Sequence, residues 1–67
     1  MNAISNEIVV GTIVVGLEHY GVVTRVEDTV IGVTYEDNYK AELRIDDVAV
    51  VLEPSPELRD WACRVIN

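Results

Sequence analysis

The sequence predicts one small all-β domain, in which five short strands bend into a barrel and a single α-helix follows at the C-terminal end. Three observations lead to this prediction. β-Branched residues recur in short runs between 8 and 52, acidic turns separate the middle runs, and prolines precede an amphipathic stretch. The 67 residues provide for a single domain, 1–67, with the barrel over 7–52 and the helix over 55–66.

The first predicted strand, 8–15, is apolar on both sides, whereas a strand with one solvated face would alternate apolar and polar residues. Its two faces carry Ile8, Val10 and Val14 on one side and Val9, Ile13 and Val15 on the other. Both faces therefore need a cover. The helix can cover one of them, and we expect a second copy of the chain to cover the face that contains Val9.

Four further strands are predicted, and the segment 16–21 between the first two is expected to form an irregular loop rather than a two-residue hairpin, because a glycine stands at each end. The predicted strands are 22–27, 30–35, 40–45 and 48–52, with polar turns at 27–29 and 36–38 and a short 3₁₀ turn at Asp46-Asp47. In 30–35 and in 40–45 the odd-numbered residues are expected to face the core.

The C-terminal segment carries the signals of a helix. Ser55 suits the N-cap and Pro56 the first helical position. One apolar stripe follows at helical spacing: Leu58, Trp61, Ala62 and Val65. We expect this stripe to cover the sheet with Trp61 as the main anchor, and we expect Cys63 to be a buried, reduced thiol.

Composition limits the classes of partner. Five basic against twelve acidic residues give a net charge of −7, which repels phosphate backbones, so no direct binding of nucleic acid is expected. A single cysteine argues against a secreted disulfide scaffold and favours the cytoplasm. No apolar run approaches the roughly 18 residues that cross a bilayer, so no membrane association is expected. Because 49% of the residues are hydrophobic, a homo-oligomer is expected.

Residues for catalysis are scarce in this chain. His19 is the single histidine, and no histidine lies near Cys63 in the sequence, so no catalytic residue and no enzyme activity is predicted. The acidic pairs in the turns lack the spacing and the central glycine of a calcium loop. We therefore predict no metal site and no cofactor. A lone histidine in a loop is more often structural or solvated than functional.

Aromatic residues gather near the loops at one end of the predicted barrel. The candidate binding residues are His19, Tyr20, Tyr35 and Tyr39. Aromatic ring faces attract cations, and several rings together can form a cage for a methylated cation. The alternative for these residues is ordinary packing, above all for Tyr35, which is expected to belong to the core.

The order of the predicted elements resembles an SH3-like barrel. Within it, Gly11–Val15 (GTIVV) and His19–Val23 (HYGVV) resemble the start of Tudor-like and KOW-like modules, as in CarD-type transcription factors, the tails of UvrD-type helicases and transcription elongation factors. The resemblance covers 11–52. It implies a docking domain without catalytic residues, with an RNA polymerase or a helicase as partner. KOW-type domains that touch RNA carry basic loops, whereas the matching loops here are acidic.

Three functional hypotheses follow. The first is a non-catalytic protein–protein interaction module, an accessory protein of a transcription or DNA-processing complex or of a mobile element. The second is an acidic mimic of nucleic acid that inhibits a DNA- or RNA-binding enzyme. The third is a small oligomeric ligand-binding protein or enzyme with a pocket at a subunit interface. Carboxylates in a row on one face would favour the mimic, and carboxylates scattered over the loops would favour the interaction module.

Overall fold

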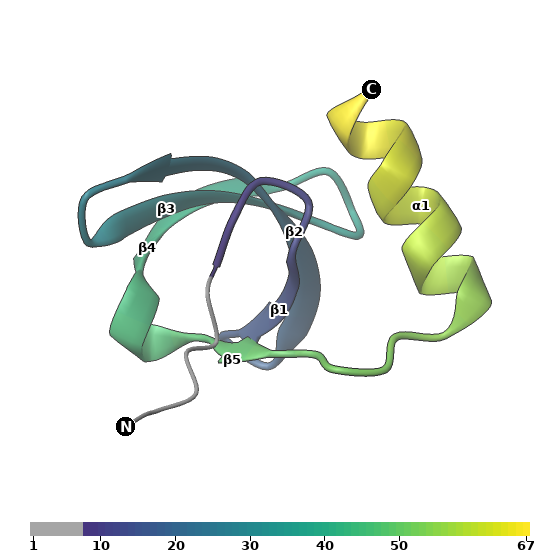
Figure 1. Ribbon diagram of the computed structural model, residues 1–67, viewed down its shortest axis with the longest axis horizontal. Coiled ribbons are helices and arrows are strands. Elements are labelled where there is room, and N and C mark those ends of the chain that lie inside the picture. Colours follow the sequence, from purple (N-terminus) through teal and green to yellow (C-terminus); the bar gives the residue numbers. More distant parts are fainter. Residues whose placement is uncertain (1–7) are drawn as a thin grey trace.

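The computed structural model describes residues 8–67, which form five antiparallel strands in one sheet and one C-terminal helix. The elements are β1 (Ile13–Gly16), β2 (His19–Glu27), β3 (Val30–Tyr35), β4 (Lys40–Arg44), the 3₁₀ turn η1 (Ile45–Asp47), β5 (Ala49–Val50) and α1 (Pro56–Ile66). The strand order is β4-β3-β2-β1-β5, and the sheet curls round on itself with α1 outside it (Figure 1). The predicted mainly β fold class with one terminal helix is confirmed.

A β-bulge in β2 bends the sheet. Val23 pairs with Val33 and Arg25 pairs with Gly32, so Thr24 is an extra residue on β2. The Thr24 hydroxyl donates a hydrogen bond to the Gly32 carbonyl at 3.3 Å. Bulges of this kind increase the local twist and bend of a strand. Here the bulge follows the part of β2 that pairs with β1, and the bend lets one continuous sheet surround a core.

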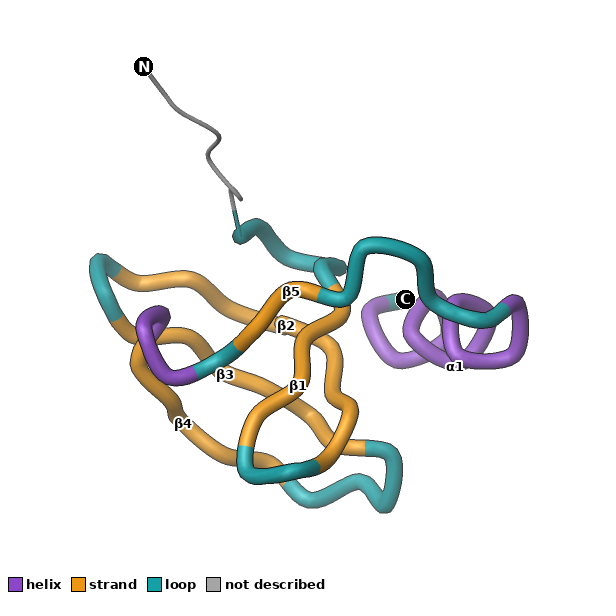
Figure 2. The backbone as a smooth tube through the Cα atoms, turned by 90° about the horizontal axis from the view of Figure 1, so that it is seen from below, coloured by secondary structure: helices purple, strands orange, loops and turns teal. Residues whose placement is uncertain are grey.

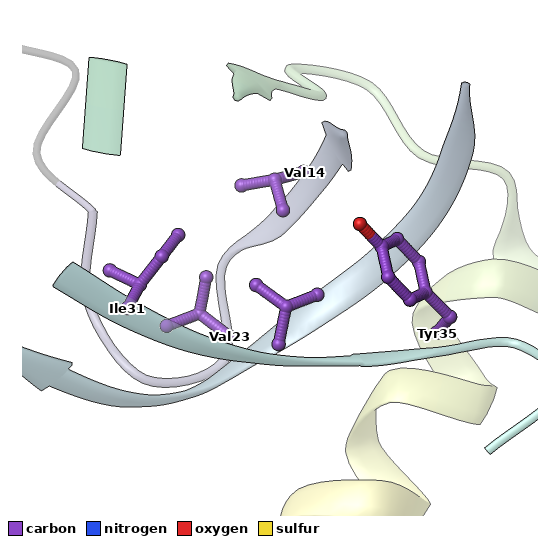
Figure 3. Close-up of a cluster of buried hydrophobic side chains, with 5 residues drawn as sticks. Val14, Val23, Ile31 and Tyr35 are labelled. Carbon is purple, nitrogen blue, oxygen red and sulfur yellow. The ribbon is translucent and has the colours of Figure 1, made fainter. Parts of the chain in front are cut away.

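The inside of the curled sheet is filled by what we call the interior cluster, which Figure 3 shows in part. Its buried members are Val14, Val23, Ile31, Val33 and Tyr35, and Ile8, Ala41, Leu43, Ile45 and Val48 pack against them. β3 and β4 contribute alternate residues to this cluster, because successive side chains of a strand point to opposite faces. The predicted inward residues of β3 and β4 are confirmed.

The helix covers the outer face of β1 and β2 and forms a second core, the helix cluster. It consists of buried Ile13, Val22, Leu58 and Ala62, with Val51, Trp61 and Val65 partly buried against them. Ile13 and Val22 are paired residues of β1 and β2. The N-cap is confirmed, because the Leu58 N–H donates to the Ser55 hydroxyl oxygen at 3.1 Å. Figure 2 shows α1 to one side of the curled strands.

The first predicted strand is shorter than expected, and the prediction that Ile13 belongs to the oligomer face is wrong. The strand begins at Ile13, and residues 9–12 form a turn in which the Thr12 N–H donates to the Val9 carbonyl at 3.0 Å. Ile13 is 6% exposed because α1 covers it, so it offers no surface to a second copy. Val9 is exposed and Val15 is partly buried. Self-association stays a prediction without Ile13.

Trp61 packs against the helix cluster and is partly exposed, whereas Leu58 and Ala62 are buried, so the role of Trp61 as the main anchor stays a prediction. One prediction for the helix is wrong. Cys63 is exposed rather than buried. The reason is that the helix rests on the sheet along the Leu58–Ala62 side, and a residue directly after Ala62 is rotated by about 100° away from that contact.

The last strand, β5, has two residues and is shorter than the predicted strand 48–52.

We predict that Leu58→Ala lowers the free energy of unfolding by about 2 to 5 kcal/mol, because it empties the centre of the helix cluster. Urea unfolding followed by circular dichroism measures the loss. Leu52→Ala is the matched control, since Leu52 is 80% exposed and the change should stay within about 0.5 kcal/mol. Equal small effects of both substitutions would contradict the role of α1 as part of the core.

Candidate functional site

The connection between β1 and β2 is a strained two-residue hairpin turn. Gly16 pairs with His19, and the two residues between them, Leu17 and Glu18, have φ of +57° and +69°. Positive φ at both central positions is the geometry of a type I′ turn, which strongly prefers Asn-Gly. Other L-residues lose about 1–2 kcal/mol each in this conformation. The predicted irregular loop at 16–21 is therefore wrong.

The two glycines near this turn belong to strands and are required by close packing. A Cβ atom on Gly21 would lie 2.5 Å from Val33 Cγ1 and 3.2 Å from Tyr35 Cδ1. A Cβ atom on Gly16 would lie 3.0 Å from Leu43 Cδ1. These side chains fill the space that a larger residue would need. The glycines thus let β1 and β2 pass tightly against the interior cluster and continue directly into the short turn.

The turn between β3 and β4, residues 36–38, lies beside this hairpin. The Tyr35 N–H donates to the Tyr39 carbonyl at 2.8 Å and closes the turn, and Asn38 takes its left-handed position with φ of +71°. Asparagine tolerates this conformation well. The Tyr39 N–H donates to Asp37 Oδ1 at 3.1 Å, which fixes the carboxylate of Asp37 next to Tyr39.

Between the two turns lies an open hollow of about 470 Å³, which we call the aromatic corner. Its lining consists of Leu17, His19, Tyr35, Glu36, Asp37 and Tyr39. The His19 and Tyr35 rings meet edge to face, with centroids 6.0 Å apart and planes at 73°. The Tyr35 and Tyr39 rings are stacked, with centroids 6.3 Å apart and planes at 21°. Three of the four predicted binding residues therefore come together here.

Tyr20 does not line the aromatic corner. It follows His19 on β2, and successive side chains of a strand point to opposite faces, so Tyr20 lies on the other side of the sheet, opposite Val15. Sequence reasoning missed Leu17, Glu36 and Asp37 as site residues. Leu17 could have been identified from the sequence, because a large apolar residue in a turn is a signal of a binding surface.

The aromatic corner is acidic. Glu36 and Asp37 line it, Glu18 lies in the adjoining turn, and no lysine or arginine is among the lining residues. The lining also contains no serine, cysteine or lysine that could act as a nucleophile beside His19. Aromatic ring faces and carboxylates both attract positive charge. The arrangement is thus suited to hold a cationic or mixed apolar and cationic group.

Tyr35 contributes its ring to the corner and its hydroxyl to the core. The side chain is 5% exposed, and its hydroxyl points into the interior cluster (Figure 3), with no hydrogen-bond partner among residues 8–67. Burial raises the pKa of this phenol above its ordinary value of 10.0, because the phenolate would lose its hydration, and nearby Tyr39 adds to the rise. Tyr35 therefore stays neutral and acts as a fixed wall.

Two features are absent from the part of the chain that the structure describes, a cluster of metal ligands and a membrane-spanning helix. Residues 8–67 contain no group of three histidine, cysteine, aspartate or glutamate side chains placed to hold a metal ion. None of the described helices has the length and apolar character that a membrane-spanning helix needs.

We predict that replacing Leu17-Glu18 by Asn-Gly raises the free energy of unfolding by about 1–3 kcal/mol, because it removes the strain at two positive-φ positions. Thermal and urea unfolding measure the gain. Replacing the exposed pair Asp46-Asp47 of η1 by Asn-Gly serves as the control and should bring no gain. A loss of stability in the Leu17-Glu18 variant would show that the hairpin is not strained.

We predict that Tyr35→Phe raises the free energy of unfolding by about 1 kcal/mol at neutral pH, because it removes a buried hydroxyl without a partner. The folded-state pKa of Tyr35 lies above the unfolded value, so ionisation above about pH 10 favours the unfolded chain and stability falls as the pH rises. The variant should lose less stability than the wild type between neutral pH and alkaline pH. If the variant and the wild type lost equal stability between neutral and alkaline pH, the prediction would be wrong.

Comparisons with protein-family models, with curated proteins and with solved structures each found no match.

Proposed function

We propose that this protein is a non-catalytic protein–protein interaction module that docks a segment of its partner on the aromatic corner. The observation that carries the proposal is the exposure of two large apolar side chains on the border of one hollow. Leu17 is 68% exposed and Tyr39 is 63% exposed, and both line the corner. Apolar side chains gathered at a concave surface, with a few polar groups beside them, are typical of binding sites.

The conformation of the turn supports the same proposal. Leu17 is held in a left-handed conformation that costs free energy and places an apolar side chain in water. Residues in such conformations occur more often at functional sites, where binding makes use of the geometry. Leu17 contacts a partner segment that enters the corner, and the burial of its side chain there offsets the cost of its exposure.

The distribution of charge favours an interaction module over a nucleic-acid mimic. The carboxylates of the described residues are scattered over every turn of the sheet, over β2 and β4, and before and on the helix: Glu18, Glu27, Asp28, Glu36, Asp37, Glu42, Asp46, Asp47, Glu53, Glu57 and Asp60. Basic groups on the sheet are partly neutralised, since Arg25 pairs with Glu42 at 2.5 Å and with Glu27 at 3.6 Å. Such a surface has few basic side chains that could pair with the phosphates of a nucleic acid.

The order of the elements along the chain, with a 3₁₀ turn between β4 and β5, supports keeping the SH3-like resemblance within the proposal. We include in the proposal an accessory protein of a transcription or DNA-processing complex, as this resemblance suggests, or of a mobile element. The single cysteine favours the cytoplasm as its location. Self-association through the exposed Val9 and the partly buried Val15 remains part of the proposal, as a homo-oligomer that leaves the aromatic corner open.

Peptide selection tests the docking site. The full chain is used to select binding peptides from a random displayed library, and Tyr39→Ser and Leu52→Ser variants are then compared. We expect Tyr39→Ser to lower the affinity for the selected peptides by about tenfold or more, as is typical of a residue at the centre of an interface. Leu52→Ser should leave their affinity unchanged, because Leu52 is also a large exposed side chain, at 80%, but does not line the corner. If the selected peptides lost affinity only for the Leu52→Ser variant, the proposed site would be wrong.

We further predict that the protein does not bind duplex DNA or single-stranded RNA at physiological salt, because affinity for nucleic acid comes chiefly from pairing basic side chains with phosphates. A fluorescence anisotropy titration measures this directly. Micromolar binding that weakens with rising salt and with Arg44→Ala would overturn the prediction and favour direct contact with nucleic acid over a protein partner.

A further inference from the structure

The aromatic corner also indicates which chemical group it takes, and this inference rests on the proposed function. We propose that the corner binds one unmodified arginine side chain of the partner segment. The guanidinium lies against the Tyr39 ring and is held by the carboxylates of Asp37 and Glu36, and an apolar neighbour of the arginine packs on Leu17.

The first argument is the ring geometry. Tyr35 and Tyr39 stack on one another, so Tyr39 turns one face toward Tyr35 and remains 63% exposed elsewhere. The face of an aromatic ring carries negative electrostatic potential, and a planar guanidinium can lie flat on it. The buried Tyr35 supports the ring from behind, and His19 meets Tyr35 at a steep angle and forms a second wall.

The second argument is the position of the carboxylates. Asp37 uses Oδ1 to accept the Tyr39 N–H, which fixes the carboxylate beside the ring, and its other oxygen, Oδ2, remains an acceptor. Glu36 precedes it in the same turn and lines the same hollow. Guanidinium carries several donors in one plane, so a single arginine can lie on a ring and donate to neighbouring carboxylates together. Arg25 and Arg64 are paired with carboxylates elsewhere, with Glu42 and Asp60.

The third argument separates arginine from methylated lysine. A trimethylammonium group is held by rings that surround it. In the aromatic corner the Tyr35 and Tyr39 planes differ by only 21° and their centroids lie 6.3 Å apart, so these two rings are stacked on one another rather than arranged around a common centre. Tyr20, which would be needed to complete a cage, lies on the other face of β2. The open, acid-lined corner therefore fits a flat cation with donors.

Nuclear magnetic resonance of the ¹⁵N-labelled full chain tests the inference. The probes are N-acetyl-arginine methylamide, the corresponding lysine and trimethyllysine compounds, and the citrulline compound, which has nearly the same shape as arginine without its charge. We expect the arginine probe to shift the amide signals of His19, Asp37 and Tyr39. The citrulline probe should shift none of them, and the lysine and trimethyllysine probes should bind several-fold more weakly.

Matched variants localise the effect. Asp37→Asn keeps an oxygen that can accept the Tyr39 N–H and removes only the charge, so the fold is retained and the affinity for the arginine probe should fall about tenfold. Asp47→Asn removes the same charge from η1, outside the corner, and should leave the affinity unchanged. Equal shifts with citrulline, stronger binding of trimethyllysine, or an affinity that Asp37→Asn does not change would each overturn the inference.

The two proposals fail separately. If selected peptides bind at the corner, as judged by Tyr39→Ser, but keep their affinity when each arginine is replaced by citrulline, the choice of arginine is wrong and the protein-docking function stands. If no selected peptide depends on Tyr39, the docking site itself is wrong and the arginine inference falls with it. Peptides that need both Tyr39 and an arginine support both proposals.

Discussion

The pairing of β1 with β2 is the interaction on which the rest of this domain depends, because these two strands carry both hydrophobic clusters. Their inward residues Val14 and Val23 belong to the interior cluster, and their outward pair Ile13 and Val22 forms the floor under α1. With one cysteine in 67 residues, no disulfide can form within the chain. A domain of this size buries only about 60% of the surface of its unfolded chain, less than a larger domain does, so stability requires that both faces of the same strands be used.

The same packing builds the aromatic corner. Gly21 lies against Val33 and Tyr35, and a side chain at this position would displace them. The Tyr35 ring can therefore rest close to β2, where the edge-to-face contact with His19 forms. The tight hairpin before His19 leaves no long loop to cover this contact, and the hollow stays open to a partner. The candidate site is thus a consequence of how the core closes at one end of the curled sheet.

The parts of the fold that depend on neighbouring residues could be predicted from the sequence. The strand 30–35, the alternation in 40–45 and the helix start at Ser55-Pro56 follow from local patterns, and the structure confirms each of them. The parts that depend on distant contacts could not be predicted in this way. Gly16 and Gly21 indicated a loop by the usual rule, but they are glycines because side chains from β3 and β4 approach them.

The candidate site shows the same division. His19, Tyr35 and Tyr39 could be named in advance, since aromatic residues beside turns gather at one end of a barrel. Their mutual geometry, and the exclusion of Tyr20, required the register of β1 and β2, which a wrong loop prediction obscured. The exposure of Cys63 has a similar cause, because the side of α1 that faces the sheet is decided by Ile13 and Val22 and not by the helix alone.

Several unfavourable features of this small domain meet at the aromatic corner, and the proposed ligand would relieve more than one of them. Folded domains are stable by only about 5–15 kcal/mol, so two residues in the left-handed conformation are a substantial fraction of what is available. Leu17 adds exposed apolar surface, and Glu18, Glu36 and Asp37 add like charges nearby. An arginine with an apolar neighbour would cover the leucine and offset part of the negative charge in one step. Asn-Gly in the turn would relieve the strain but would remove the leucine, so stability and the proposed binding would make opposite demands on the same two residues.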